Sequence, residues 1–281
     1  MIIHYNVPLA KYTTFGIGGP ARIFITAESE QDIINVVTAY RGKNEMLRIL
    51  GGGSNVLISD GGVDGAVLHI GRGFDKIVLS GDTVRAESGA RLSRVAYEAG
   101  KAGLTGLEWA AHIPGTLGGA VFMNAGAYGG DMSAVTESVR VVSDSFQLNE
   151  CGFSYRRSVF QTNGGIITGA VLRLKRGSAD DIKRLTNEYY LKRKNTQPSG
   201  QRSAGSVFKN MNGVPAAKYI DALNLKGLSV GGARVSTVHA NFIVNTGGAT
   251  CSDVLSLIEI IKEKVYNAYG VTLETEIKNM I

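Results

Sequence analysis

The feature that most limits what this chain can fold into is the glycine-dense stretch at residues 103–130. It holds eight glycines, a proline and the single tryptophan of the chain. Glycine loses more conformational entropy on folding than any other residue, so a stretch this dense indicates positive φ angles or backbone that lies directly against another group. We interpret residues 103–130 as a binding surface for a cofactor.

A second glycine cluster, Gly-Gly-Gly-Ser-Asn at residues 51–55, lies between two apolar runs that predict strands at residues 47–50 and 56–58. Consecutive backbone N–H groups in such a loop can form a concave site for a phosphate. The loop is not a Rossmann fingerprint, because a strand rather than a helix follows it, and the chain has no Walker A sequence. The residues alone leave open whether the loop binds phosphate or only turns the chain.

The composition is that of a globular protein. The 281 residues are 44% apolar, which is sufficient for two domains, and alternating helix and strand signals indicate an α+β architecture. A net charge of +6 suits a phosphate-bearing ligand, but no basic stripe interleaved with aromatic residues predicts a nucleic-acid partner. Without a signal peptide or a long apolar run, we expect a soluble, cytoplasmic protein that does not insert into a membrane.

The cysteines and histidines indicate neither a disulfide framework nor a metal site. Cys151 and Cys251 are a hundred residues apart and lack CxxC spacing, so we expect both to be small core residues. The four histidines are scattered without an HxH or HxxxH pair. No metal is therefore expected.

Local patterns predict the elements that carry these loops. Helices are expected at residues 30–41, with Ser29 as the N-cap, at 92–99, ended by Gly100, at 178–194, from Pro215 onwards and at 254–265. Strands are expected at residues 23–25, 138–143, 165–175 and 241–245, and residues 65–89 are expected to form antiparallel strands with a hairpin turn at 81–82. Residues 197–204 form the predicted linker.

The C-terminal segment, VTLETEIKNMI at residues 271–281, alternates as a strand does. This pattern places Glu274 and Glu276 on one face, where a core-facing strand would carry apolar side chains. A carboxylate on such a face is a candidate site residue, although a charge on an exposed edge strand would also account for it.

Taken together, these pieces resemble the UDP-N-acetylenolpyruvoylglucosamine reductases, the flavoenzymes that complete UDP-N-acetylmuramate for bacterial peptidoglycan and cell-wall biogenesis. The resemblance covers nearly the whole chain and rests on seven segments in the same order. They are YTTFGIGGPA, ILGGGSNVLI, IPGTLGGAVFMNAGAYGG, SYRRSVF, AGSVFKN, HANFIVN and the terminal LETE.

The resemblance implies an FAD-binding fold of the vanillyl-alcohol-oxidase (PCMH) type. It would comprise subdomains at residues 1–62 and 63–198, an α+β substrate domain at 199–269, and a last strand, 270–281, that returns to the second subdomain. FAD would be bound without a covalent link. The residues implied for FAD contact are Gly51, Gly52, Gly53, Ser54, Asn55, Ile113, Pro114, Gly115, Thr116, Gly118, Gly119, Asn124, Ala125 and Gly126.

Three further side chains carry over from the family motifs as catalytic residues. Arg156 would hold the negative charge that develops on the enolpyruvyl group, Ser206 would protonate its carbanionic carbon, and Glu276 would orient this array. Each alone has a plainer interpretation, as a surface arginine, a serine at the start of a strand and an exposed glutamate on an edge strand. Lys209, Asn210 and Asn241 are the implied substrate contacts.

The chain also departs from the family pattern. Met211 follows the FKN segment, where members of the family commonly have proline, so the loop after Asn210 is expected to differ in shape. The chain also lacks the inserted loop that carries a substrate-binding tyrosine in longer members. It therefore resembles the shorter subclass.

The predicted activity is NADPH-dependent, FAD-mediated reduction of UDP-N-acetylglucosamine enolpyruvate to UDP-N-acetylmuramate. The residues do not distinguish NADPH from NADH and do not fix the oligomeric state, for which a monomer is the favoured expectation. Two alternatives stay open. One is an FAD oxidase of the same fold, which would not need Arg156, Ser206 and Glu276 together, and the other is a nucleotide-sugar-binding protein without turnover or tightly bound flavin.

Overall fold

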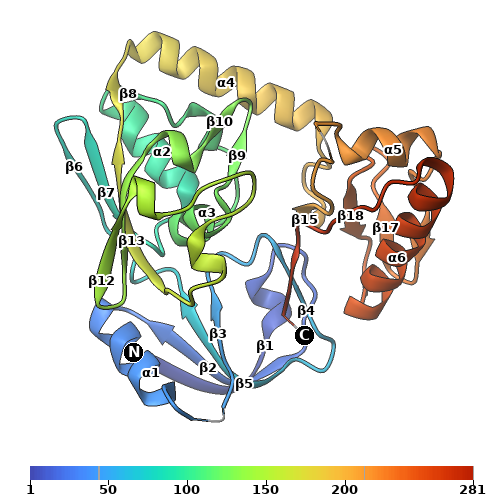
Figure 1. Ribbon diagram of the computed structural model, residues 1–281, viewed down its shortest axis with the longest axis horizontal. Coiled ribbons are helices and arrows are strands. Elements are labelled where there is room, and N and C mark those ends of the chain that lie inside the picture. The colour runs from blue at the N-terminus through green and yellow to red at the C-terminus, as the bar shows by residue number, and fades with distance from the viewer. Residues whose placement is uncertain (44, 212, 281) are drawn as a thin grey trace. The chain divides into compact units, whose positions relative to one another are not determined.

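The computed structural model describes residues 1–43, 45–211 and 213–280 and separates into two compact units. The first unit comprises residues 1–4, 24–52 and 66–192, and the second comprises 5–23, 53–65 and the described chain from 193 onwards. The division falls inside the 51–55 glycine loop and within three strands of one sheet, whose order is β1-β2-β5-β3 (Figure 1). The predicted domain boundaries at residues 62 and 198 stay predictions.

The strands in which the division falls are β1 (Ile2–Pro8), β2 (Pro20–Ala27) and β5 (Val63–Ile70). The other elements of the first unit are α1 (Glu30–Tyr40), β3 (Leu47–Leu50), β6 (Ile77–Ser80), β7 (Thr83–Glu87), α2 (Leu92–Lys101), β8 (Leu104–Thr105), α3 (Leu117–Met123), β9 (Gly126–Ala127), β10 (Gly130–Asp131), β11 (Thr136–Val141), β12 (Asp144–Gln147), β13 (Ile167–Arg173), β14 (Lys175–Arg176) and most of α4 (Ala179–Thr196). Short 3₁₀ turns lie between them, at Glu108–Ala110, Met132–Ala134, Leu148–Glu150 and Val159–Gln161.

A five-stranded antiparallel sheet, in the order β12-β11-β13-β7-β6, is the framework of the first unit. Helices α2 and α3 pack against β7, and α3 also packs against β13 (Figure 1). The apolar side chains of both helices and of the central strands form one buried cluster, which also contains Trp109. The glycine-dense stretch therefore runs directly over the core of this unit.

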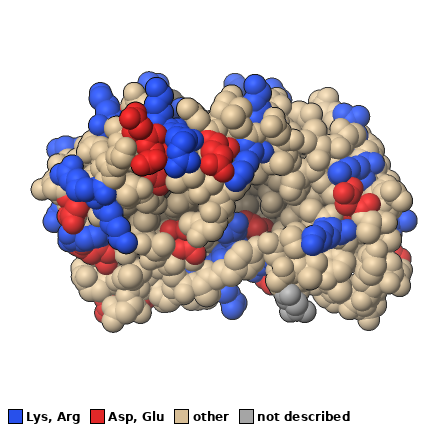
Figure 2. All heavy atoms as spheres, turned by 90° about the horizontal axis from the view of Figure 1, so that it is seen from above, with Lys and Arg blue, Asp and Glu red and all other residues tan. Residues whose placement is uncertain are grey.

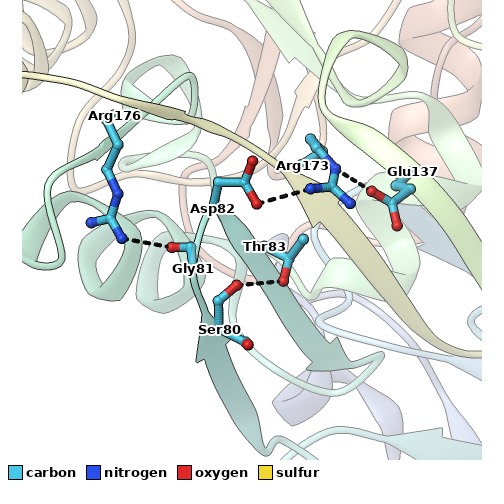
Figure 3. A network of polar contacts seen from close by, with 7 residues as sticks. All are labelled: Ser80, Gly81, Asp82, Thr83, Glu137, Arg173 and Arg176. Carbon is cyan, nitrogen blue, oxygen red and sulfur yellow. Dashed lines mark hydrogen bonds and ion pairs between the residues drawn. The ribbon is translucent and has the colours of Figure 1, made fainter.

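Charged side chains connect β11, β13 and the β6–β7 turn at one end of the strands of this sheet (Figure 3). Arg173 of β13 contacts Asp82 at 2.8 Å and also Glu137 of β11, and Arg176 donates to the carbonyl of Gly81 at 3.1 Å. Because the Arg173 side chain is 54% exposed, solvent screens these pairs, and they add little to stability. They connect the predicted hairpin turn at residues 81–82 to β13 and β14.

The second unit is built on a four-stranded antiparallel sheet in the order β15-β18-β17-β16. Helices α5 and α6 contact each other, and α6 packs against β16 and β17. The elements are the 3₁₀ turn Leu9–Tyr12, β4 (Val56–Ile58), β15 (Arg202–Ser206), α5 (Ala216–Ala222), β16 (Ser229–Val230), β17 (Ala233–Val235), β18 (Phe242–Asn245), α6 (Cys251–Tyr269) and β19 (Lys278–Met280).

Several local predictions are confirmed. Ser29 Oγ accepts from the Asp32 N–H and begins α1, and β6 and β7 form the predicted hairpin. Both cysteines are buried, with 0% and 3% exposure, and burial raises the pKa of each thiol to about 11. Neither thiol is therefore a reactive thiolate at neutral pH.

Other local predictions are wrong. Residues 65–89 are not all antiparallel, because β5 pairs parallel with β3. Helix α2 continues to Lys101, past Gly100, and the left-handed glycine after it is Gly103, with φ +71. The predicted linker at 197–204 contributes its last three residues to β15, where pairing with β18 decides the structure despite the polar composition.

The C-terminal segment also differs from its prediction. Among its described residues, 271–280, only Lys278–Met280 forms a strand, and this strand pairs parallel with β4, which lies in residues 1–62 rather than in the second predicted subdomain. Ahead of it, one antiparallel bridge joins Thr275 to Phe208. The alternation of apolar residues still matches burial, since Leu273 and Ile277 are 2% and 4% exposed.

The surface carries charges of both signs. On the face drawn in Figure 2, Lys and Arg side chains lie among Asp and Glu side chains and many uncharged residues. Among the described residues, no helix is long and apolar enough to cross a membrane, and no cluster of three or more His, Cys, Asp and Glu residues could hold a metal ion.

Candidate cofactor and active site

The two glycine clusters meet in the first unit. A Cβ atom on Gly52 would lie 2.6 Å from the Cα of Gly115, and one on Gly51 would lie 2.6 Å from Oγ1 of Thr116. Real Cβ atoms do not approach other atoms so closely, so both positions require glycine for the loops to touch. The loop after β3 and the loop before α3 therefore form one continuous backbone surface.

This surface offers backbone donors at the 51–55 loop rather than at α3. In the described part of the chain, no protein acceptor takes the N–H groups of Gly51, Gly52 or Gly53. The first N–H groups of α3 are used, because Leu117 donates to Ala90 at 2.8 Å and Gly118 donates to Ser88 at 2.9 Å. A diphosphate that binds here would take its hydrogen bonds from the glycine loop, and the cradle fits such a group.

The rest of the 51–55 loop lies in the second unit. Gly53 has φ +60, and a Cβ there would lie 1.9 Å from the carbonyl oxygen of Tyr12. Asn55 donates from Nδ2 to the carbonyl of Glu276 at 3.2 Å, and its own carbonyl accepts from Lys278 at 3.0 Å. Ser54 is half-buried beside it. This half of the loop supports the C-terminal segment as well as any ligand.

The other predicted FAD residues lie around α3. Ile113, Pro114, Gly115 and Thr116 form the approach to the helix, Gly118 and Gly119 its first turn, and Asn124, Ala125 and Gly126 follow its end. A Cβ on Gly118 would lie 2.7 Å from the Cβ of Ser88, whereas one on Gly119 would make only an ordinary contact at 3.7 Å. Gly118 is therefore needed for packing of the helix on the sheet.

Asn124 connects α3 to the arginine motif. It ends the helix in the left-handed conformation, with φ 42, and is 2% exposed. Its Nδ2 donates to the carbonyl of Ser154 at 3.0 Å, and its Oδ1 accepts from the N–H of Ser133 at 3.0 Å. These partners make Asn124 a structural residue in this unit, and its contact with FAD stays a prediction.

The SYRRSVF segment is held on the end of α3 by further side chains. The hydroxyl of Ser158 donates to the carbonyl of Phe122 at 2.6 Å. Gln161 donates to the same carbonyl at 2.9 Å and to the carbonyl of Arg156 at 3.0 Å. Sequence reasoning missed Ser158 and Gln161, because no local pattern shows that they bond with a helix more than thirty residues earlier in the chain.

Arg156 projects from the tight turn that this segment forms. Ser154 and Arg157 exchange backbone hydrogen bonds at 3.1 and 3.0 Å, and Arg156 between them has φ 56. Its guanidinium donates to the carbonyl of Gly126 at 3.0 Å and lies 5.1 Å from the ring centre of Tyr155. The side chain is half-buried, so the cation at the glycine-dense stretch has a fixed position.

Ser206 and Glu276 lie on neighbouring backbone segments of the second unit. Ser206 ends β15, and Val207 after it accepts the N–H of Glu276 at 2.8 Å. Lys209 donates its N–H to the carbonyl of Glu274 at 2.9 Å, and its ammonium pairs with the Glu274 carboxylate. The structure thus brings Ser206 and Glu276 together, whereas Arg156 belongs to the first unit, and its convergence with them stays a prediction.

Asn241 holds the Ser206 segment from the other side. Its amide accepts from the N–H of Phe208 at 2.9 Å and donates to the carbonyl of Phe208 at 2.8 Å, and its side chain is buried. Its own N–H donates to Nδ1 of His239 at 3.2 Å, which requires an unprotonated nitrogen. Burial lowers the pKa of His239, with Lys226 adding to the effect, and so favours that form. The predicted substrate contact of Asn241 stays a prediction.

The backbone hydrogen bonds of Met211 account for one departure from the family pattern, which is the lack of a proline after the FKN segment. Its N–H donates to the carbonyl of Val214 at 3.0 Å, and Val214 donates back at 2.8 Å. Proline has no N–H and could not make the first of these bonds. The side chain of Asn210 accepts from the N–H of Ala216 at 3.4 Å and so connects the FKN segment to the start of α5.

Comparison with known proteins agrees with this arrangement. Residues 21–151 match the family model of an FAD binding domain, and residues 197–280 match that of the UDP-N-acetylenolpyruvoylglucosamine reductase C-terminal domain. A reductase of that name from Clostridium novyi is 42% identical over 98% of this chain and 91% of its own length. One from Caldanaerobacter subterraneus is 42% identical over 98% and 93%.

A solved structure agrees as well. The crystal structure of UDP-N-acetylenolpyruvylglucosamine reductase from Thermus caldophilus is 38% identical, covers 100% of both chains and has a TM-score of 0.87. The fold and the glycine surface define an FAD-dependent oxidoreductase with an FAD-binding fold of the PCMH type and an added α+β domain. The chain belongs to the UDP-N-acetylenolpyruvoylglucosamine reductase family.

Replacement of Gly52 tests the glycine surface. Gly52→Ala places a methyl group against the Gly115 backbone, so the two loops must separate, and the purified protein should lose at least about tenfold in FAD affinity, or about 1.4 kcal/mol. Visible flavin absorbance after desalting measures it. Gly61→Ala is the matched control, because a Cβ there would only contact Oγ of Ser59 at 3.7 Å. Full flavin retention by Gly52→Ala would contradict the assignment.

Replacement of Asn241 separates a structural role from substrate contact. Asn241→Ala leaves the buried N–H and carbonyl of Phe208 without partners, which should lower the free energy of unfolding by about 1–3 kcal/mol without substrate present. Urea denaturation followed by circular dichroism measures this change. Asn267→Ala, on the exposed face of α6, is the control and should change stability little. Unchanged stability of Asn241→Ala would leave substrate binding as its only role.

Proposed function

We propose that this chain uses NADPH and bound FAD to reduce UDP-N-acetylglucosamine enolpyruvate to UDP-N-acetylmuramate, a cytoplasmic step of peptidoglycan synthesis. The observation that carries the proposal is the joining of the 51–55 loop to the 113–119 loop, in the unit where a half-buried arginine is held by Gly126. The name and full-length coverage of the Thermus caldophilus structure support the same activity. The net charge of +6 suits NADPH and the nucleotide sugar, which are both anionic.

FAD, when bound, supplies hydride transfer from NADPH to the methylene carbon of the enolpyruvyl group. The side chains of this chain have the remaining tasks. Arg156 stabilises the negative charge that develops on the enolpyruvyl carboxylate, and a guanidinium suits this role because it stays protonated and has fixed donors. Its bond with the Gly126 carbonyl holds the guanidinium before substrate arrives, so little reorganisation is needed.

Ser206 delivers the proton that completes the reduction. Its hydroxyl protonates the carbon next to the substrate carboxylate, and Glu276 orients and polarises this donor. The support is their proximity, because the Glu276 N–H is bonded to the residue after Ser206. Lys209, whose side chain is 13% exposed, and Asn210 contact the nucleotide sugar from the same segment.

The activity is tested by following NADPH absorbance with and without the enolpyruvyl UDP sugar under nitrogen and in air. We expect NADPH consumption to require the sugar and to match lactyl ether formation one to one. Oxidation in air that the sugar does not change would favour the FAD oxidase and contradict the proposal. A protein that binds the sugar but holds no flavin would favour the binding protein without turnover.

Replacement of Ser206 tests its role. Ser206→Ala should leave flavin reduction by NADPH intact and slow the second half-reaction by about 10²–10⁴-fold, the range for loss of a general acid. Stopped-flow absorbance resolves the two half-reactions. Ser203→Ala, in the same strand, is the control and should leave both rates unchanged. Loss of flavin reduction in Ser206→Ala would contradict the assigned role.

A further inference from the structure

Helix α4 contacts the glycine-dense stretch through two neighbouring tyrosines in the first unit. The ring of Tyr189 stacks on Tyr128, with centroids 4.6 Å apart and an angle of 4° between planes. The ring of Tyr190 contacts His112, with centroids 4.8 Å apart. His112 immediately precedes the predicted FAD residues 113–119, so one turn of α4 contacts both ends of the region that the proposed function requires.

Tyr128 lies at the tip of a hairpin, in a backbone conformation that a tyrosine rarely adopts. Strands β9 and β10 pair Ala127 with Gly130, and the two residues between them have φ 54 at Tyr128 and φ 84 at Gly129. A tyrosine in this conformation is strained by about 1 kcal/mol or more, and such residues persist only where their surroundings hold them. The Tyr189 ring supplies one such contact on the side-chain face of the turn.

The same hairpin carries the acceptor that holds Arg156. Gly126 begins β9 and accepts from the Arg156 guanidinium at 3.0 Å. The second strand of the hairpin packs on Trp109 next to the turn, since a Cβ on Gly130 would lie 2.3 Å from Cδ1 of that ring. Contacts from Tyr189 to Tyr128 and from Trp109 to Gly130 thus hold the hairpin, and with it the Gly126 carbonyl.

Tyr189 itself has a fixed position. It is half-buried against the core cluster on the same face of α4 as buried Ile182, seven residues earlier. The ammonium of Lys192 lies 5.8 Å from the ring centre and bonds to Glu188 at 2.7 Å. The ring can therefore hold Tyr128 in one orientation.

We propose that Tyr189 is a positioning residue that orients Arg156 for the second half-reaction through Tyr128 and the Gly126 carbonyl. The inference rests on the proposed function, because Arg156 acts there on the substrate carboxylate. Tyr189 does not touch the substrate. Loss of its ring should loosen the hairpin and misplace the guanidinium, while the glycine surface at residues 51–53 and 115–116 stays intact.

The test uses Tyr189→Leu, which removes the stacking, and Tyr189→Phe, which retains it, in the flavin-loaded protein. Tyr189→Leu should slow reoxidation of the reduced flavin by the UDP sugar about tenfold, because displacement of a charge-stabilising group by a fraction of an ångström has effects of this size. Flavin content and reduction by NADPH should stay within about twofold of wild type. Leu191→Ala, in the same turn of α4 and 54% exposed, is the control for disturbance of the helix.

Two further measurements separate positioning from general destabilisation. In an Arg156→Lys background, Tyr189→Leu should have little added effect on reoxidation, because the two residues act in series. Amide hydrogen exchange of residues 126–131 should be about tenfold faster in Tyr189→Leu than in Tyr189→Phe or Leu191→Ala, whichever substrate the enzyme uses. Equal slowing of both half-reactions, full additivity with Arg156→Lys, or unchanged exchange would overturn the inference.

The experiment also separates this inference from the proposed function. A wild-type protein that does not turn over the UDP sugar would overturn the proposed function. The hydrogen-exchange comparison would still show whether the stacking of Tyr189 on Tyr128 holds the hairpin. Wild-type turnover together with normal reoxidation in Tyr189→Leu would overturn the positioning role alone.

Discussion

The close approach of the Gly52 and Gly115 backbones is the constraint on which the candidate cofactor site depends. A single methyl group at Gly52 would separate the loop after β3 from the loop before α3, since its carbon would lie 2.6 Å from the Gly115 Cα. Among the described residues, no protein group accepts the N–H groups of residues 51–53, so they are available to a ligand. The family match to an FAD binding domain over residues 21–151 names that ligand.

The 51–55 loop serves both units. Its first two glycines complete the backbone surface of the first unit, and Asn55, in the second unit, binds the backbone of Glu276 and Lys278. The C-terminal segment in turn places Glu276 beside the residue that follows Ser206. A change at the Ser54 or Asn55 end of this loop would therefore disturb the predicted catalytic glutamate, while a change at Gly51 or Gly52 would disturb the cofactor surface.

The sequence predicted most accurately those features of the fold that depend on neighbouring residues. The Ser29 cap and the hairpin at residues 81–82 each follow from a few neighbouring residues, and the structure agrees. The need for glycine at Gly51 and Gly52 comes instead from residues 115 and 116, far along the chain. The parallel pairing of β3 with β5 and of β19 with β4 was missed, because a parallel partner is chosen by contacts far along the chain. Family resemblance supplied Arg156 and Ser206 and chose Glu276 over Glu274, which the alternation of the last segment had offered equally. The convergence of the three side chains follows from no spacing in this chain.

Strained backbone marks the positions where a particular side chain is present although glycine would fit the local conformation better. Six non-glycine residues in the described chain have positive φ, and three of them, Asn124, Tyr128 and Arg156, lie on the end of α3, the following hairpin and the arginine turn. Glycine would relieve each by about 1 kcal/mol, but each side chain makes a contact that glycine cannot. Asn124 bonds to Ser154, Arg156 bonds to Gly126, and Tyr128 stacks on Tyr189. These contacts join α3 to the arginine turn, the arginine turn to the β9–β10 hairpin, and the hairpin to α4. The strain at the three residues is therefore offset by one connected set of contacts, which also holds the guanidinium of Arg156.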